Sequence, residues 1–221
     1  MSTQILILFL INSSQIKPVT SIATEVSPNL VCEVQHAIRF QESEWSPELC
    51  QELATAYNKE GESQKIKGLP VIGFAISINE SDLRAKVTSE PFKRIILTKK
   101  KKLPKEVKVV DVGLMGVRCL KGEKGHCIND PVSGMTVSNL LNPIKNIEVG
   151  MKILKSKYEM HGKDWLMKYN GGSTESHGYA GKINAILFAL NGIQLKVSGK
   201  RMKKLTGQIV EAVTRGVVAS R

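Results

Sequence analysis

The chain reads LPVIGFAISINESDL over residues 69–83, and this stretch decides the fold. Pro70 fits the first turn of a helix, and the dense apolar residues after it predict that the helix is buried. Asn79 and Glu80 fall near its carboxyl end. Burial disfavours the charged form of a carboxyl group, so the pKa of Glu80 is expected to rise, leaving a protonated acid near neutral pH. The plainer interpretation is a solvated or capping glutamate, which is the commoner use of Glu at a helix end.

Helices are predicted on both sides of this stretch. Residues 24–68 have a helical and polar pattern, in which Ser46 is the N-cap of a helix with Pro47 in its first turn and Gly61 near its end. Downstream, apolar residues at helical spacing predict three more helices. These begin at Asn142-Pro143, near Trp165 and near Tyr179.

Two β-rich segments, KRIILT at residues 93–98 and VKVV at residues 107–110, interrupt the helical pattern. They predict a small β-hairpin or paired extended segments. The basic run Lys99–Lys102 lies between them and would form the tip, where such a run is usually a solvated turn. The predicted fold class is therefore α+β, helix-rich with a small β-hairpin element.

The chain has 221 residues, enough for one well-buried core, and a formal charge of +12. A balance this basic favours a polyanionic partner, which can be nucleic acid, an anionic membrane surface or a cell wall. No ribonucleoprotein block, zinc finger or helix-turn-helix signature supports nucleic acid, so that partner is not expected. The charge alone does not choose between the other two.

Both ends of the chain are predicted to differ from the domain between them. The apolar run at residues 5–11 is too short to span a bilayer but suits the core of a signal peptide, although no basic residue precedes it. We expect a signal peptide over residues 1–23, an exported domain over residues 24–197, and a basic amphipathic tail over residues 198–221. The tail can equally be an ordinary core helix.

Four cysteines suggest two disulfides in an exported chain. Cys119 and Cys127 lie in a Gly-rich loop that a short bridge would close, while the alternative is a zinc site with His126. Cys32 and Cys50 can pair or can simply be buried. The cysteine spacing fits zinc poorly, so no metal and no cofactor is expected.

Two further blocks combine glycines with residues suited to a sugar ligand. They are DVGLMGV at residues 111–117 and LMKYNGG at residues 166–172, and Asn142-Pro143 and Asn146-Ile147 stand between them. Glycine lets the backbone approach a ligand closely, and Tyr and Asn supply stacking and hydrogen bonds. The plainer interpretations are a glycine turn after a strand and the end of a helix.

In this order, Glu-Ser, Gly-Leu-Met, Asn-Pro with Asn-Ile, and Tyr-Asn-Gly resemble the soluble lytic transglycosylases, which are related in fold to goose-type lysozyme. The resemblance covers roughly residues 48–190 and implies cleavage of peptidoglycan glycan strands by a monomer. Glu80 would protonate the glycosidic oxygen between N-acetylmuramic acid and N-acetylglucosamine, then act as base on the muramyl C6 hydroxyl. Because that hydroxyl is already in place, it can replace an activated water and form a 1,6-anhydro ring.

The resemblance also implies which residues contact the substrate. Ser81 would position the glycan or the carboxyl, Met115 would line the cleft, and Tyr169 would orient Glu80. The full set of implied substrate-binding residues is Ser81, Gly113, Leu114, Met115, Tyr169 and Asn170.

Two positions leave the outcome of the reaction open. The family commonly has Gln after Gly-Leu-Met, where this chain has Gly116, so one side-chain hydrogen bond to the glycan would be missing. Asp111 could position a water and make the enzyme a hydrolase, or could bind local backbone at a strand end. A non-catalytic wall-binding protein is the further alternative, against which Glu80 argues. Basic patches are expected to hold the protein on the anionic wall.

Overall fold

A computed structural model describes residues 24–39, 44–62, 66–97, 104–169 and 176–194. The expected signal peptide, the basic run Lys99–Lys102, Asn170 and the basic C-terminal tail lie outside the described residues. No described helix is long and apolar enough to cross a membrane.

The helices begin where local capping signals place them. The side chains of Ser27, Ser46 and Asn142 each accept a hydrogen bond from a backbone N–H in the first turn, and a proline follows each cap. The helix predicted to end at Gly61 does so, and the helix predicted around Tyr179 begins three residues earlier. The helices are α1 Pro28–Ile38, α2 Pro47–Gly61, α3 Leu69–Ser81, α4 Val137–Leu140, α5 Pro143–His161, α6 Trp165–Tyr169 and α7 Ser176–Gln194, with a 3₁₀ turn at Gly162–Asp164.

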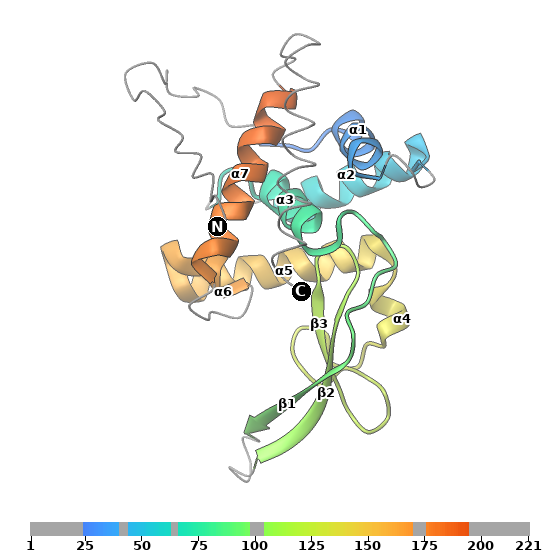
Figure 1. Cartoon of the computed structure of the whole chain (residues 1–221), viewed down its shortest axis with the longest axis vertical. Helices are drawn as coiled ribbons and strands as arrows, with labels where there is room; N and C mark the ends of the chain where they lie inside the picture. Colours follow the sequence, from blue (N-terminus) through green and yellow to red (C-terminus); the bar gives the residue numbers. More distant parts are fainter. Residues whose placement is uncertain (1–23, 40–43, 63–65, 98–103, 170–175, 195–221) are drawn as a thin grey trace, which may run out of the picture.

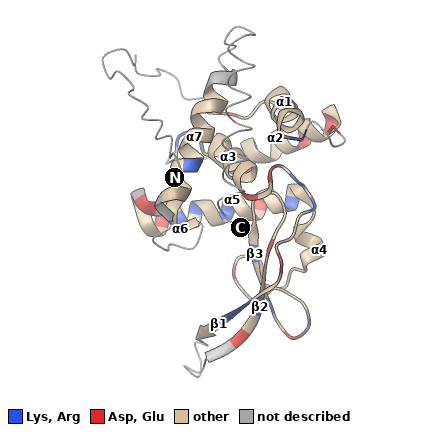
Figure 2. Ribbon diagram, in the orientation of Figure 1, with Lys and Arg blue, Asp and Glu red and all other residues tan. Residues whose placement is uncertain are grey.

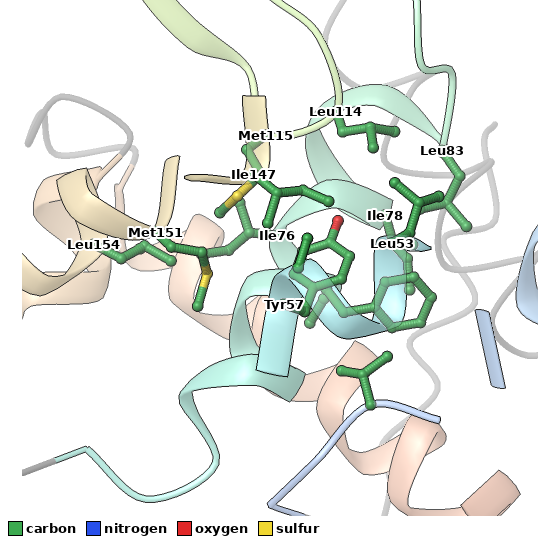
Figure 3. Close-up of a cluster of buried hydrophobic side chains, with 14 of the residues drawn as sticks. Leu53, Tyr57, Ile76, Ile78, Leu83, Leu114, Met115, Ile147, Met151 and Leu154 are labelled. Atoms are coloured by element: carbon green, nitrogen blue, oxygen red, sulfur yellow. The ribbon is translucent and has the colours of Figure 1, made fainter. Parts of the chain in front are cut away.

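Helix α3 lies at the centre of the helical body, as its apolar sequence predicted (Figure 1). It packs against α2, α5 and α7, and its side chains join the core that Figure 3 shows. The hydroxyls of Tyr57 and Ser77 lie 2.6 Å apart within this core, so both buried polar groups are satisfied. Contacts on several sides hold α3 in place, and with it the glutamate near its end.

The sheet has three antiparallel strands in the order β1-β2-β3 and projects from the helical body (Figure 1). β1 Phe92–Leu97 and β2 Pro104–Val112 are the two segments predicted to pair. β3 Val117–Lys121 is not predicted by the sequence pattern, because glycines on both sides of it favour a loop there. Cys119 therefore lies in a strand, and the predicted hairpin is one part of a larger sheet.

Both predicted cysteine pairs are disulfides. Cys32–Cys50 joins α1 to α2 with its Cα atoms 5.6 Å apart, and Cys119–Cys127 joins β3 to the segment after it with its Cα atoms 5.0 Å apart. The zinc alternative required free thiolates, so it does not hold for this arrangement. The described residues contain no group of His, Cys, Asp and Glu placed to hold a metal ion.

Candidate active site

A pocket of about 590 Å³ opens where the carboxyl end of α3 meets the sheet and α5. Glu80 comes from α3, Asp111 and Arg118 come from neighbouring strands, and Tyr169 comes from α6. The glutamate that the sequence singled out therefore faces a space large enough for part of a polymeric ligand.

Glu80 is a pocket carboxyl group with a strongly altered acidity. Its pKa rises from 4.5 to about 7, mainly because burial removes the carboxyl group from water. The hydroxyl of Tyr179 opposes the rise, the charge of Asp111 adds to it, and Asn79 and Arg118 oppose it. A carboxyl group that gains and loses a proton near neutral pH is suited to general acid and base catalysis.

Tyr179, on α7, is a site residue that the sequence reasoning missed. Its side chain is 5% exposed, and its hydroxyl interacts with the Glu80 carboxyl closely enough to lower the pKa of that group. Among the described residues, however, no partner of this hydroxyl meets the distance and angle expected of a hydrogen bond. Burial in turn raises the pKa of Tyr179 well above its usual value, so it stays a neutral hydroxyl beside Glu80. The sequence signalled it only as an apolar position on a predicted helix.

Gly116 packs directly against the Glu80 carboxyl. Its φ of +58° belongs to the left-handed region that favours glycine, and a Cβ at this residue would lie 2.8 Å from Oε2 of Glu80. The same Cβ would lie 3.3 Å from Cβ and Cγ of Glu80. The missing side chain at residue 116 thus leaves space that the carboxyl group itself fills.

Asn146 holds the loop that carries Gly116. Its Oδ1 accepts from the N–H of Met115 at 2.8 Å, and its Nδ2 donates to the carbonyls of Val112 at 2.8 Å and Leu140 at 2.9 Å. Gly113, with φ +73°, leaves room for this amide, because a Cβ there would collide with it. The Asn-Ile motif therefore holds the Gly-Leu-Met loop through the Asn146 amide, and this loop places Gly116 against Glu80.

Tyr169 fastens the same loop from the other side of the pocket. Its hydroxyl donates to the carbonyl of Met115 at 2.7 Å, and its ring lines the pocket. Its pKa is raised by burial and, to a smaller degree, by the charge of Glu80, which places it close to that carboxyl. Tyr169 thus lies near Glu80, as predicted. Its hydroxyl, however, hydrogen-bonds the backbone carbonyl of Met115 and not Glu80.

Asp111 and Arg118 face each other across β2 and β3. Arg118 donates from Nε to Oδ1 at 2.8 Å and from Nη2 to Oδ2 at 2.9 Å, so both oxygens of Asp111 are held. The guanidinium also stacks over the ring of Phe92, 5.7 Å from its centroid. The carboxylate of Asp111 is therefore ion-paired, and the interpretation that it binds local backbone is wrong.

Residues 57–184, more than half of the chain, match the family model described as Transglycosylase SLT domain. The chain belongs to this family. Comparisons with curated proteins and with solved structures find no match. SLT domains are peptidoglycan lytic transglycosylases, so membership makes the chain one of a group of enzymes that cleave the glycan of the cell wall.

Three residues of the SLT motifs lie differently from what the resemblance implied. The side chains of Leu114 and Met115 are fully buried, and Met115 fits against Gly150 of α5. The Ser81 side chain is buried as well and donates to the carbonyl of Ser77 at 2.9 Å. None of these side chains lines the pocket, because each packs into the core that positions Glu80 and its loop. Their contribution is to shape the site.

Proposed function

We propose that this chain cleaves the bond between N-acetylmuramic acid and N-acetylglucosamine without water, leaving a 1,6-anhydro end. The observation that carries the proposal is the Glu80 carboxyl, which has a pKa of about 7 and opens onto a pocket at the end of α3. Membership of the SLT family supplies the polymer on which this acid acts.

In the first step, the proton of Glu80 moves to the glycosidic oxygen as the bond from the muramyl C1 to that oxygen breaks. The departing N-acetylglucosamine leaves as an alcohol, and Glu80 becomes a carboxylate. In the second step, the muramyl C6 hydroxyl attacks C1 and gives its proton to Glu80. The carboxyl is restored, no water is consumed, and one group with a pKa of about 7 performs both transfers.

Gly116 and Tyr179 support this double use of one carboxyl. Gly116 allows the carboxyl to rest against the loop backbone, which limits its positions. Tyr179 supplies a neutral hydroxyl that lowers the pKa of Glu80, so it favours the ionised form that the second step needs. Near neutral pH, the protonated and ionised forms of Glu80 are therefore similar in free energy.

Hydrolysis is the second candidate, and Asp111 and Asp130 motivate it because both line the pocket with Glu80. A water-activating base must have a lone pair free for the water. Arg118 engages both oxygens of Asp111, which weakens that residue as a base and favours the intramolecular hydroxyl.

Mass spectrometry of the fragments released from purified peptidoglycan tests the proposal. Anhydro-muramyl ends, lighter by one water, are expected, and reducing ends would assign the enzyme as a hydrolase. Glu80→Gln should abolish release, while Glu52→Gln, an exposed position on α2, should not change it. Undiminished clearance by the Glu80 variant would contradict the catalytic assignment.

We further propose that the protein is exported and works on the wall as a monomer, with basic patches holding it to anionic polymer. Two disulfides and the peptidoglycan substrate of its family support export. Adhesion through Lys99–Lys102 stays a prediction, tested by neutralising the run and measuring sedimentation with cell walls at low salt. Unchanged sedimentation would contradict it.

A further inference from the structure

Three lysines form one row across the sheet. The strand register places Lys93 of β1 directly opposite Lys108 of β2, and Lys108 directly opposite Lys121 of β3. Directly opposite residues of antiparallel strands project from the same face, and neighbouring strands lie about 5 Å apart. Figure 2 shows basic residues on this sheet, which projects from the helical body. Lys93, Lys108 and Lys121 are called the lysine row below.

The lysine row lies on the face of the sheet that points away from the active-site pocket. Side chains alternate between the two faces along a strand. Arg94 directly follows Lys93, so it projects from the other face, and Asp111, an odd number of residues after Lys108, does the same. Both Arg94 and Asp111 line the pocket. A ligand bound at the lysine row would therefore not compete with a glycan beside Glu80.

The row carries more positive charge than the acids of the described residues balance. Lys93 pairs with Glu106 of β2 at 2.9 Å, while Lys108 and Lys121 form no ion pair with the part of the chain that the structure describes. Like charges directly opposite each other destabilise an antiparallel sheet, so the row lowers the stability of the free protein. An anion between Lys108 and Lys121 would replace this repulsion by attraction, so a negatively charged ligand would recover the lost free energy.

The type of cation and its arrangement indicate the kind of anion. The row is made of Lys alone, and an ammonium group is a point charge that suits a phosphate oxygen. A carboxylate, by contrast, is matched best by the planar fork of an arginine. The row extends across three strands, about 10 Å, which indicates a chain with repeated charges rather than one small anion. A linear polymer with phosphates at short intervals therefore fits the row.

The rest of this face argues against two other polyanionic partners. None of its described strand residues is aromatic, since Phe92 projects from the other face with Arg94, so nothing in these strands would stack there on a nucleic-acid base. Beside the row, Ile95 is 71% exposed, and Glu106 stands directly opposite it. An isoleucine next to an acid provides little apolar surface to enter an anionic bilayer. A wall polymer is therefore favoured over nucleic acid and over a membrane surface.

We propose that the lysine row binds a linear phosphodiester polymer of the cell wall, which runs across the three strands. The polymer places phosphates between neighbouring lysines and so offsets their repulsion. Because the pocket is on the other face, the enzyme stays on the polymer while Glu80 acts on a glycan strand. The inference rests on the proposed function only in placing the protein at the wall, and it locates wall binding on residues outside the run Lys99–Lys102.

Binding of soluble poly(glycerol phosphate) to the full chain, followed by fluorescence anisotropy at low salt, tests the inference. The double variant Lys108→Gln with Lys121→Gln should bind the polymer more weakly by about tenfold or more, the size expected for lost charge-assisted contacts. The control variant Lys67→Gln with Lys182→Gln removes the same charge from exposed positions outside the sheet and should bind nearly as the wild type does. Unchanged binding in the row variant, or an equal loss in both variants, would overturn the inference.

The stability of the free protein separates a ligand site from a lysine that serves the fold. Lys108→Gln, at the centre of the row, should raise the urea midpoint at low salt, and the gain should shrink in about 1 M salt, which screens charges more than about 3 Å apart. The polymer should raise the midpoint of the wild type by more than that of the Lys108 variant. A wild type that the polymer does not stabilise, or a Lys108 variant less stable than the wild type, would contradict the proposed site.

Two further probes distinguish the wall polymer from other polyanions. They are vesicles of phosphatidylglycerol and a single-stranded oligonucleotide with as many phosphates as the polymer. The row substitutions Lys108→Gln and Lys121→Gln should weaken polymer binding by a larger factor than binding to either probe. A larger loss for the vesicles or for the oligonucleotide would assign the row to that ligand and overturn the inference.

Glu80→Gln separates this inference from the proposed function. This variant should bind poly(glycerol phosphate) as the wild type does while it releases no muropeptides, and the row variant should still cleave walls stripped of phosphodiester polymer. Polymer binding by an enzyme that releases reducing ends in place of anhydro ends would uphold the lysine row and refute the proposed reaction. Anhydro ends from an enzyme that does not bind the polymer would uphold the reaction and refute the row.

Discussion

Replacing Gly116 by alanine should separate the loop backbone from the acid it supports. A Cβ at this position would lie 2.8 Å from Oε2 of Glu80, whereas ordinary contact begins at 3.4 Å. The carboxyl or the loop must therefore give by about half an ångström, and Asn146 and Tyr169 hold the loop with several hydrogen bonds. We expect the carboxyl to move.

The expected loss follows from the sensitivity of proton transfer to geometry. A displacement approaching 1 Å can cost about 100-fold in rate, so a shift of half that size should lower kcat by about tenfold or more. The φ of +58° adds strain of about 1 kcal/mol to the folded state, because an alanine there adopts a left-handed conformation.

Gly125→Ala provides a matched control for that strain. Gly125 has a φ of +76°, and no atom lies within 4 Å of the place that a Cβ would occupy, so the substitution introduces the backbone cost without the collision. Both variants should lose similar stability in thermal or urea unfolding. Release of soluble muropeptides should fall in the Gly116 variant alone, and equal activity in the two would refute the reasoning.

Three other predictions follow from the site. Asp111→Asn should lower the pKa of Glu80 and move the alkaline limb of the pH–rate profile to lower pH, whereas Arg118→Gln should move it to higher pH; shifts of the opposite sign would contradict the assigned charges. Because the folded pKa of Glu80 lies above its unfolded value, the wild type loses stability between pH 4.5 and about 7. Glu80→Gln should therefore be more stable than the wild type above pH 7, by about 3 kcal/mol, and the difference should vanish below pH 4.5; a constant difference in urea unfolding would argue against burial as the cause. Asn146→Ala removes three hydrogen bonds to the backbone of Val112, Met115 and Leu140 and should cost about 3 kcal/mol, and a loss below 1 kcal/mol would show that the amide does not hold the loop.

The sequence by itself determined where α2 and α5 begin and the place of the acid. Ser46 and Asn142 cap their helices through hydrogen bonds to residues three positions away, so the signal is contained within one turn. The apolar run before Glu80 likewise predicted a buried helix with a carboxyl near its end, because burial follows from composition when almost every position is apolar.

Only the tertiary structure decided which side chains meet that carboxyl. Tyr179 and Gly116 come from a distant helix and a loop, and Asp111 meets Arg118 through the register of β2 and β3. The motif residues Leu114 and Met115 proved to be core residues of that loop. Such contacts depend on how elements far apart in the chain pack, and a helical or alternating pattern records the periodicity of one element and not its neighbours. Glu80 could therefore be found from the sequence, while the groups that set its pKa could not.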